Sequence, residues 1–371
     1  MEYNLDIFSD SSMCTKDYTF ISYMEGLKMR KNSFAFIAMI SWIVVLVFLL
    51  SILVYGLSRS QYSHSIPSIP RVPVVPPVSV DNTVTYMENT DIHLIKEETF
   101  SIDKLTNLSF DSSFESLIVE ITDSDELTVL QYGDPELDKE FKSSIDNGNL
   151  KINLPGRDHA NNYFDFSFMH PRLEIYIPEG YSNAVSLESS SGSIDISGYP
   201  NWSDVSVTSS SGSININELN ALNADIQTSS GSLNGQDITV KKDLKLSSNS
   251  GTIQFNRIIC KEFNIQTTSG GFFTDEITGS GDIESSSGSL NINDFTILGN
   301  TKITSSSGSI NMSTVPSQNY KLNLQTSSGG INCAFPVKYE NDQKHKASGT
   351  VGNGSAGTLS VSTDSGSINI D

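Results

Sequence analysis

The feature that most constrains the fold is a short sequence, Ser-Gly-Ser-Ile or a close variant, which recurs through the second half of the chain. Successive copies lie 18 to 21 residues apart, except for a last step of 37 residues. A nearly fixed interval of this size indicates one supersecondary unit copied many times, as in a solenoid. The repeated glycines are Gly192, Gly212, Gly231, Gly251, Gly270, Gly288, Gly308, Gly329 and Gly366.

Apolar residues alternate with polar ones on both sides of each glycine. Positions two and four after it, and five and seven before it, are mostly Ile, Leu, Val or Phe. This alternation predicts two short, half-buried strands in each repeat, with Ile214 facing inward and Asn215 outward. We expect the Ser-Gly step to form the corner between them, with the glycine at positive φ and the serines bonded to neighbouring backbone.

The third position after the glycine is usually an amide. This row fits parallel, in-register stacking, in which like side chains bond along a ladder. We therefore predict an all-β fold, a parallel β-solenoid of about nine coils of about 20 residues over residues 183–371. At ~4.8 Å per coil it would span roughly 43 Å. The alternative is an antiparallel arrangement with Ser-Gly hairpins in propeller blades, but nine repeats do not pair evenly into blades. The row reads Asp195, Asn215, Asn234, Gln254, Phe273, Asn291, Asn311, Asn332 and Asn369.

Residues 90–182 also resemble strands but lack the strict period. The segment LIVEITDSDELTVLQY predicts two strands around an acidic turn at Asp123 to Glu126, and HANNYFDFSFMHP predicts a loop. We expect this region to be a β-rich N-terminal cap that covers the edge of the first coil. Residues 336–358, within the long last step, are expected to form an insertion or an irregular coil.

The N-terminal quarter predicts a membrane anchor. Phe34 to Leu57 is an uncharged run of 24 residues, and as a helix of about 36 Å it is long enough to cross a bilayer. Lys28, Arg30 and Lys31 precede it, so residues 1–33 are expected in the cytoplasm and the remainder outside. Residues 58–89 then form a proline-rich extracellular linker, with five prolines between positions 58 and 80. The predicted localisation is the cell membrane, with a single pass.

Charge narrows the choice of partners. Residues 81–371 carry 17 basic and 38 acidic side chains, a net charge of −21. Such a surface repels phosphate polymers, so nucleic acid is not an expected partner. A neutral glycan of the cell envelope, or a surface protein with a basic face, is a better match.

The sequence offers no catalytic constellation, and we predict no enzyme, no cofactor and no metal site. His159 and His170 share one loop with Asp158 and Asp165, but a solvated loop is the simpler interpretation. Cys333 occupies an inward position and is expected to be a buried free thiol. The Ser/Thr-rich stripe before each glycine is either corner chemistry or a hydroxyl array that meets glycans or ice.

Residues 90–371 resemble the “putative adhesin”, β-strand-repeat domain of unknown function found in bacterial envelope proteins. The resemblance rests on LIVEITDSDELTV, LEIYIP, the TSSSGSI repeats and the ending TLSVSTDSGSINI, in that order. It implies a surface adhesin or envelope-binding module and supplies no catalytic residues. The alternative is a sensory or regulatory membrane protein that reports envelope stress, and a glycan-acting enzyme is the least supported option.

Overall fold

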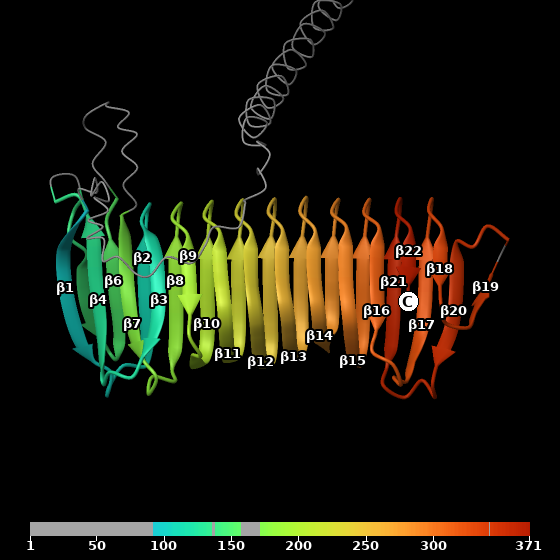
Figure 1. The fold of residues 1–371 in the computed structure, drawn as a ribbon, viewed down its shortest axis with the longest axis horizontal. Helices are drawn as coiled ribbons and strands as arrows, with labels where there is room; N and C mark the ends of the chain where they lie inside the picture. The colour runs from blue at the N-terminus through green and yellow to red at the C-terminus, as the bar shows by residue number, and fades with distance from the viewer. Residues whose placement is uncertain (1–91, 136–137, 157–170, 341) are drawn as a thin grey trace, which may run out of the picture. The chain divides into compact units, whose positions relative to one another are not determined.

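The computed structural model describes residues 92–135, 138–156, 171–340 and 342–371, all of which belong to one compact unit, Thr85–Asp371. Its strands join into a single 22-stranded sheet that winds around one hydrophobic core (Figure 1). The described part of the chain contains no helix long and apolar enough to cross a membrane. The predicted tail, span and linker at residues 1–33, 34–57 and 58–89 lie outside the described residues.

The strands fall into three groups along the chain. The first group is β1 (His93–Ser101), β2 (Asn107–Ser112), β3 (Ser116–Thr122), β4 (Glu126–Gly133), β5 (Lys142–Asp146), β6 (Asn149–Leu154), β7 (Arg172–Pro178), β8 (Ala184–Ser189) and β9 (Ile194–Ser197). The repeats supply β10 (Asn201–Ser209), β11 (Ile214–Thr228), β12 (Leu233–Ser248), β13 (Ile253–Thr267), β14 (Phe272–Ser285), β15 (Leu290–Ser305) and β16 (Ile310–Thr314). The C-terminal group is β17 (Tyr320–Thr326), β18 (Ile331–Cys333), β19 (Val337–Tyr339), β20 (Lys346–Val351), β21 (Thr358–Thr363) and β22 (Ile368–Ile370).

The repeats stack in parallel, and each residue pairs with the residue at the same position of the next repeat. Ile214 of β11 pairs with Leu233 of β12, which in turn pairs with Ile253 of β13. This pairing confirms the parallel solenoid and excludes the antiparallel hairpin alternative for the repeats. Hydrogen bonds between coils therefore satisfy the backbone, while each apolar row is covered by the same row of the next coil.

The coils of β11 to β15 have three straight segments where the sequence predicted two strands. In β11 the pairing runs over residues 214–216, 218–221 and 224–228, with breaks between them. We call the segments after, between and before the Ser-Gly corners the first, second and third walls. The prediction missed the second wall, although Leu219 and Ala221 point inward from it. Every wall follows the alternation that places apolar residues inside.

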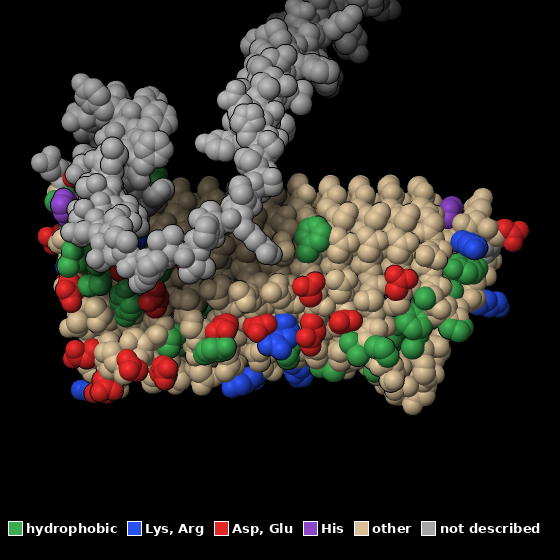
Figure 2. Space-filling model, in the orientation of Figure 1, with side chains coloured by type: hydrophobic (Ala, Val, Ile, Leu, Met, Phe, Trp, Pro, Cys, Tyr) green, Lys and Arg blue, Asp and Glu red, His purple; other side chains and the backbone are tan. Residues whose placement is uncertain are grey.

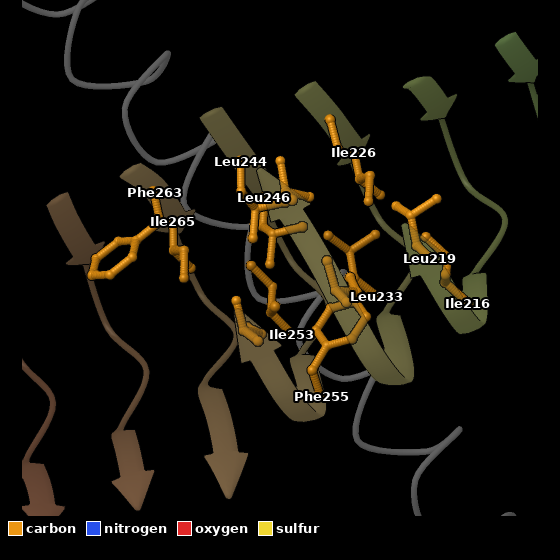
Figure 3. Close-up of a cluster of buried hydrophobic side chains, with 14 of the residues drawn as sticks. Ile216, Leu219, Ile226, Leu233, Leu244, Leu246, Ile253, Phe255, Phe263 and Ile265 are labelled. Carbon is orange, nitrogen blue, oxygen red and sulfur yellow. The ribbon is translucent and has the colours of Figure 1, made fainter. Parts of the chain in front are cut away.

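The core is a continuous stack of aliphatic and aromatic side chains. The position two residues after each glycine is at most 4 % exposed in all nine repeats. Figure 3 shows Leu233 and Ile253 of adjacent coils directed into the same interior as Leu246 and Phe255. Burial of apolar surface along the whole stack is the main stabilising contribution to the fold.

The expectation that the corner glycines adopt positive φ was wrong, because they are required for close approach between coils. None of the nine repeat glycines has a positive φ. Instead, a Cβ added at Gly231 would overlap the carbonyl oxygen of Gly212, and the same overlap recurs from coil to coil. The coils thus stack backbone on backbone at this corner, which only glycine permits.

The innermost corner hydroxyls belong to the fold. The Ser or Thr three residues before each glycine is buried in every repeat. Ser248 illustrates its role, because its hydroxyl accepts a hydrogen bond from Gly251 N at 3.0 Å and donates one to Gly231 O at 3.1 Å. The hydroxyl of this row bonds to corner backbone in eight of the nine repeats, and Ser209 is the exception. The next two residues of each corner are exposed.

The N-terminal region adds two coils that the glycine count did not reveal. Strands β2 and β3 lie between β8 and β9 on one side and β6 and β7 on the other, all parallel. Their corner reads Ser-Ser-Phe-Glu-Ser-Leu, with Glu115 in place of the glycine. Strands β1, β4 and β5 then pair antiparallel beyond β6 and β7 and cover the end of the stack.

The C-terminal coil lies inside the stack and not at its end. Strands β21 and β22 pair with β15 and β16 on one side and with β17 and β18 on the other. Figure 1 shows β21 and β22 between β16 and β17, out of chain order. The long last step contains β19 and β20, and β20 pairs antiparallel with β17 as the outer cover. The expected insertion at residues 336–358 is thus largely the C-terminal cap.

Candidate functional site: the polar first wall

The metal-ligating side chains of the described residues do not gather at one place. No group of three or more His, Cys, Asp or Glu side chains within them is placed to hold a metal ion. The loop with Asp158, His159, Asp165 and His170 lies outside the described residues. The features that the described geometry does offer are the outer surfaces of the walls.

The two cysteines of this region have the character of packing residues. Cys260 is buried and Cys333, expected to be buried, is half-buried; both are free thiols. Burial, with a smaller contribution from Asp243, raises the pKa of the Cys260 thiol to about 12. Burial also raises the pKa of Cys333. Because the thiolate is the nucleophile, neither environment favours reaction.

The outer surface of the first wall carries the predicted amide ladder. Asn234 donates to Asn215 at 3.1 Å, and Asn215 donates to Asp195 at 2.6 Å. In a second run, Asn369 donates to Asn311 at 2.7 Å and Asn311 donates to Asn291 at 2.8 Å. An amide has two N–H donors and two acceptor lone pairs, so each rung keeps hydrogen-bonding capacity for an external group.

One repeat interrupts the ladder with an aromatic residue. Phe273 stands where the other repeats have Asp, Asn or Gln, and it pairs in register with Gln254 and Asn291. The same repeat has Gly271 where most others have Ser or Thr. A Cβ at Gly271 would lie 2.6 Å and 2.9 Å from Cε2 and Cζ of Phe273, so the ring packs directly over the glycine. The two departures from the repeat are therefore coupled in space.

A shallow hollow of about 450 Å³ lies further along the first wall and begins at Asn291, the register partner of Phe273 in the next coil. It crosses four neighbouring coils, because the inserted last coil places Asn369 between Asn311 and Asn332. Asp371 is the only charged side chain that lines it. Its lining is Asn291, Asn293, Asn311, Met312, Ser313, Asn332, Asn369 and Asp371. In Figure 2 the upper part of the repeats is a broad area with few charged side chains and one isolated hydrophobic patch.

A second and larger groove, of about 830 Å³, follows the third wall on the other side of the Ser-Gly corners. Its lining is acidic, with Lys245 as the only basic residue, and Lys245 pairs with Asp225 at 3.2 Å. Asp243 and Glu262 stand directly opposite each other in adjacent coils, which places like charges side by side. The acidic residues in the lining are Asp204, Asp225, Asp243, Glu262 and Asp282.

The two walls differ in the ligands they can accept. The first wall combines an aromatic ring, unused amide capacity and little charge, which suits a neutral molecule rich in hydroxyl groups. The carboxylates of the third wall repel anions. The sequence had shown the amide row and Phe273 within it. It did not reveal the hollow, because that depends on the out-of-order last coil.

Taken together, the walls, corners and caps define an all-β parallel solenoid whose coils stack on glycine corners. A family model described as Toastrack DUF4097 matches residues 105–371. The chain belongs to this family, in agreement with the β-repeat resemblance drawn from its motifs.

Solved structures give further similarities at low sequence identity. A “putative adhesin” from Parabacteroides merdae shares 12 % identity, with 76 % of this chain and 97 % of that chain covered and a TM-score of 0.45. A “putative adhesin” from Bacteroides fragilis shares 11 %, covering 74 % and 96 %, with a TM-score of 0.41. A “putative cell adhesion protein” from Clostridium sporogenes shares 13 %, covering 74 % and 98 %, with a TM-score of 0.25. The search of curated proteins found no match.

Proposed function

We propose that this protein is a membrane-anchored surface adhesin whose solenoid binds an extended, neutral glycan of a cell envelope. The observation that carries the proposal is the polar first wall, where the amide ladder, Phe273 and the adjacent hollow lie along the stacking direction of the coils. A wall that repeats its hydrogen-bonding groups at every coil, about 4.8 Å apart, matches a polymer that repeats its hydroxyl groups.

Charge supports a neutral ligand over an anionic one. The net charge of −21 on residues 81–371 disfavours nucleic acids, teichoic acids and anionic lipid headgroups. The first-wall hollow contains a single carboxylate, so binding there would depend mainly on hydrogen bonds and ring contacts.

The anchor completes the proposal. The uncharged run at residues 34–57 would hold the chain in the membrane, and the proline-rich linker at residues 58–89 would extend the solenoid away from it. The three basic residues before the run favour an N-terminus in the cytoplasm and an extracellular solenoid.

The experiment uses intact cells that produce the full chain. They are incubated with fluorescent dextran, mannan and β-1,3-glucan as neutral probes, and with hyaluronate as an anionic probe. We expect labelling by at least one neutral probe, none by hyaluronate, and loss of labelling after external protease treatment. Absence of labelling by all three neutral probes would contradict the proposal.

Deletion of residues 1–23 separates the adhesin from the sensory alternative. An adhesin needs the anchor but not the cytoplasmic tail, so the deletion should leave glycan labelling per displayed molecule unchanged. Unchanged labelling together with loss of an envelope-stress response would instead favour the sensory function.

A further inference from the structure

We infer that Phe273, seated over Gly271, is an aromatic platform that stacks on one sugar ring, and that the adjacent hollow binds the following rings of the same chain. This inference rests on the proposed function and identifies its central contact. It concerns one repeat, in which an aromatic third position and the glycine two residues before it lie on the same outer surface. A glycine at that earlier position recurs once, as Gly330 in the repeat with Asn332.

The first argument is the coupled departure from the repeat. Eight of the nine third positions are Asp, Asn or Gln, and the aromatic exception coincides with a glycine two residues earlier. The glycine leaves room for the ring, because a Cβ there would lie 2.6 Å from Cε2 of Phe273. A packing requirement of the core does not explain the pair, because residue 273 is on the outer surface and Phe272 already fills the inner position.

The second argument is the chemistry around the ring. The two ladder runs, Asp195 to Asn234 and Asn291 to Asn369, end on either side of Gln254 and Phe273. A pyranose ring has an apolar C–H face and a rim of hydroxyl groups. An aromatic ring bordered by amides matches both features, since the ring contacts the C–H face while the amides donate to and accept from the hydroxyls.

The third argument is the position of the hollow. It starts at Asn291, the register partner of Phe273, and continues over Asn311, Asn369 and Asn332 along the stacking direction. A sugar chain that stacks on Phe273 would therefore continue into a polar depression that runs parallel to its own length. A compact ligand would use only a small part of this surface.

The test measures the affinity of the purified full chain in detergent for dextran, mannan and β-1,3-glucan, by affinity electrophoresis in gels containing each polysaccharide. Phe273→Asn restores the residue type of the other repeats, and Phe273→Leu keeps an apolar side chain without an aromatic face. We expect both variants to bind the retarding polysaccharide about tenfold more weakly, and Phe273→Tyr to bind within about twofold of the parent.

Two further variants test whether the first wall or the third wall binds the polysaccharide. Gly271→Ser restores the common residue beneath the ring and should displace it, so binding should weaken as in Phe273→Leu. Asn264 lies in the acidic groove of the third wall, so Asn264→Ala should leave polysaccharide binding unchanged. Melting temperatures of the Phe273 and Asn264 variants should stay near that of the parent, because neither side chain belongs to the buried core. Gly271→Ser is compared at a temperature at which it remains folded, because its Cβ would also lie 2.9 Å from the carbonyl oxygen of Ser289.

The outcomes are distinguishable. Undiminished binding by both Phe273→Asn and Phe273→Leu would overturn the platform and leave the proposed adhesin function intact. A loss in Asn264→Ala equal to that in Phe273→Leu would also overturn it, because the third wall would then be the binding surface. Failure of the parent protein to bind any of the three polysaccharides would overturn the proposed function itself.

Discussion

At the residue scale, the corner glycine is the position that tolerates least change. A Cβ at Gly231 would overlap the carbonyl oxygen of Gly212, and this oxygen belongs to backbone held by the stacked coils. The constraint is spatial, since the residue has no positive φ. Glu115 occupies the equivalent position in the coil formed by β2 and β3. Glycine is therefore required at corners such as Gly231, where the carbonyl oxygen of the preceding corner lies directly against the position of a Cβ.

We predict that Gly231→Ala lowers the free energy of unfolding by about 2–3 kcal/mol, as expected for overpacking. The matched control is Gly330→Ala, because a Cβ at Gly330 would meet no atom within 4 Å. This control should change stability by no more than about 0.5 kcal/mol. Urea unfolding of both variants measures the difference, and equal midpoints would show that the close corner contact is not limiting.

Neighbouring residues on one strand give a second contrast. Ile214 is fully buried, so Ile214→Asp would place a carboxylate in the core and should cost several kcal/mol, at least about 3. Asn215 lies on the outer ladder beside Asp195, so Asn215→Lys should cost about 1 kcal/mol or less. Thermal unfolding compares the two variants. Similar melting temperatures would be incompatible with the observed register.

At the scale of elements, period-two alternation was sufficient to predict which residues of the first and third walls point inward. It was not sufficient for the second wall, where bends interrupt the alternation near Asn217 and between Ala221 and Ala224. The coil with Glu115 escaped detection because its corner lacks the glycine that marks the others. The position of the last coil also could not be predicted, since a 37-residue step gives loop length but not which strand edge the chain pairs with.

The candidate site was also predictable only in part, because its shape depends on which strands pair. The amide row and Phe273 can be found in the sequence, because they occupy one repeat position. The hollow depends on Asn369 lying between Asn311 and Asn332, which follows from the inserted coil. Local pattern thus identified the chemistry of the wall, while long-range pairing determined its shape.

The inserted coil predicts how the solenoid responds to truncation. A chain that ends at Gly357 lacks β21 and β22, and each flanking coil would lose its parallel partner on that side. We expect loss of hydrogen-exchange protection in β15 to β18 and a fall in melting temperature larger than removal of a terminal repeat would cause. Protection in β15 and β16 that stayed at the level of the full chain would argue against the inserted position.

At the scale of the whole molecule, both ends of the stack are covered by antiparallel strands, β1, β4 and β5 at one end and β19 and β20 at the other. Such covers keep the parallel edges from pairing with another chain. The long walls then remain uncovered along the stack, and the proposed glycan site lies on one of them.

The predicted topology can be measured directly. Protease added to intact cells should release a fragment that begins between residues 58 and 90, because the proline-rich linker precedes the folded unit. The N-terminus of the released fragment and its mass identify the cleavage site. Protection of the whole chain in intact cells, with cleavage only after lysis, would contradict the outward orientation.

The most direct test of the central claim is the salt dependence of glycan binding by the full chain. Recognition through amides and an aromatic ring should change by less than about twofold in Kd between 0.05 M and 0.5 M NaCl, because screening acts on charges. The control is poly-lysine, whose binding to the acidic third wall should fall steeply over the same range. Neutral-glycan binding that persists across this range is the result we predict. Binding only to poly-lysine, lost as salt rises, would contradict the account.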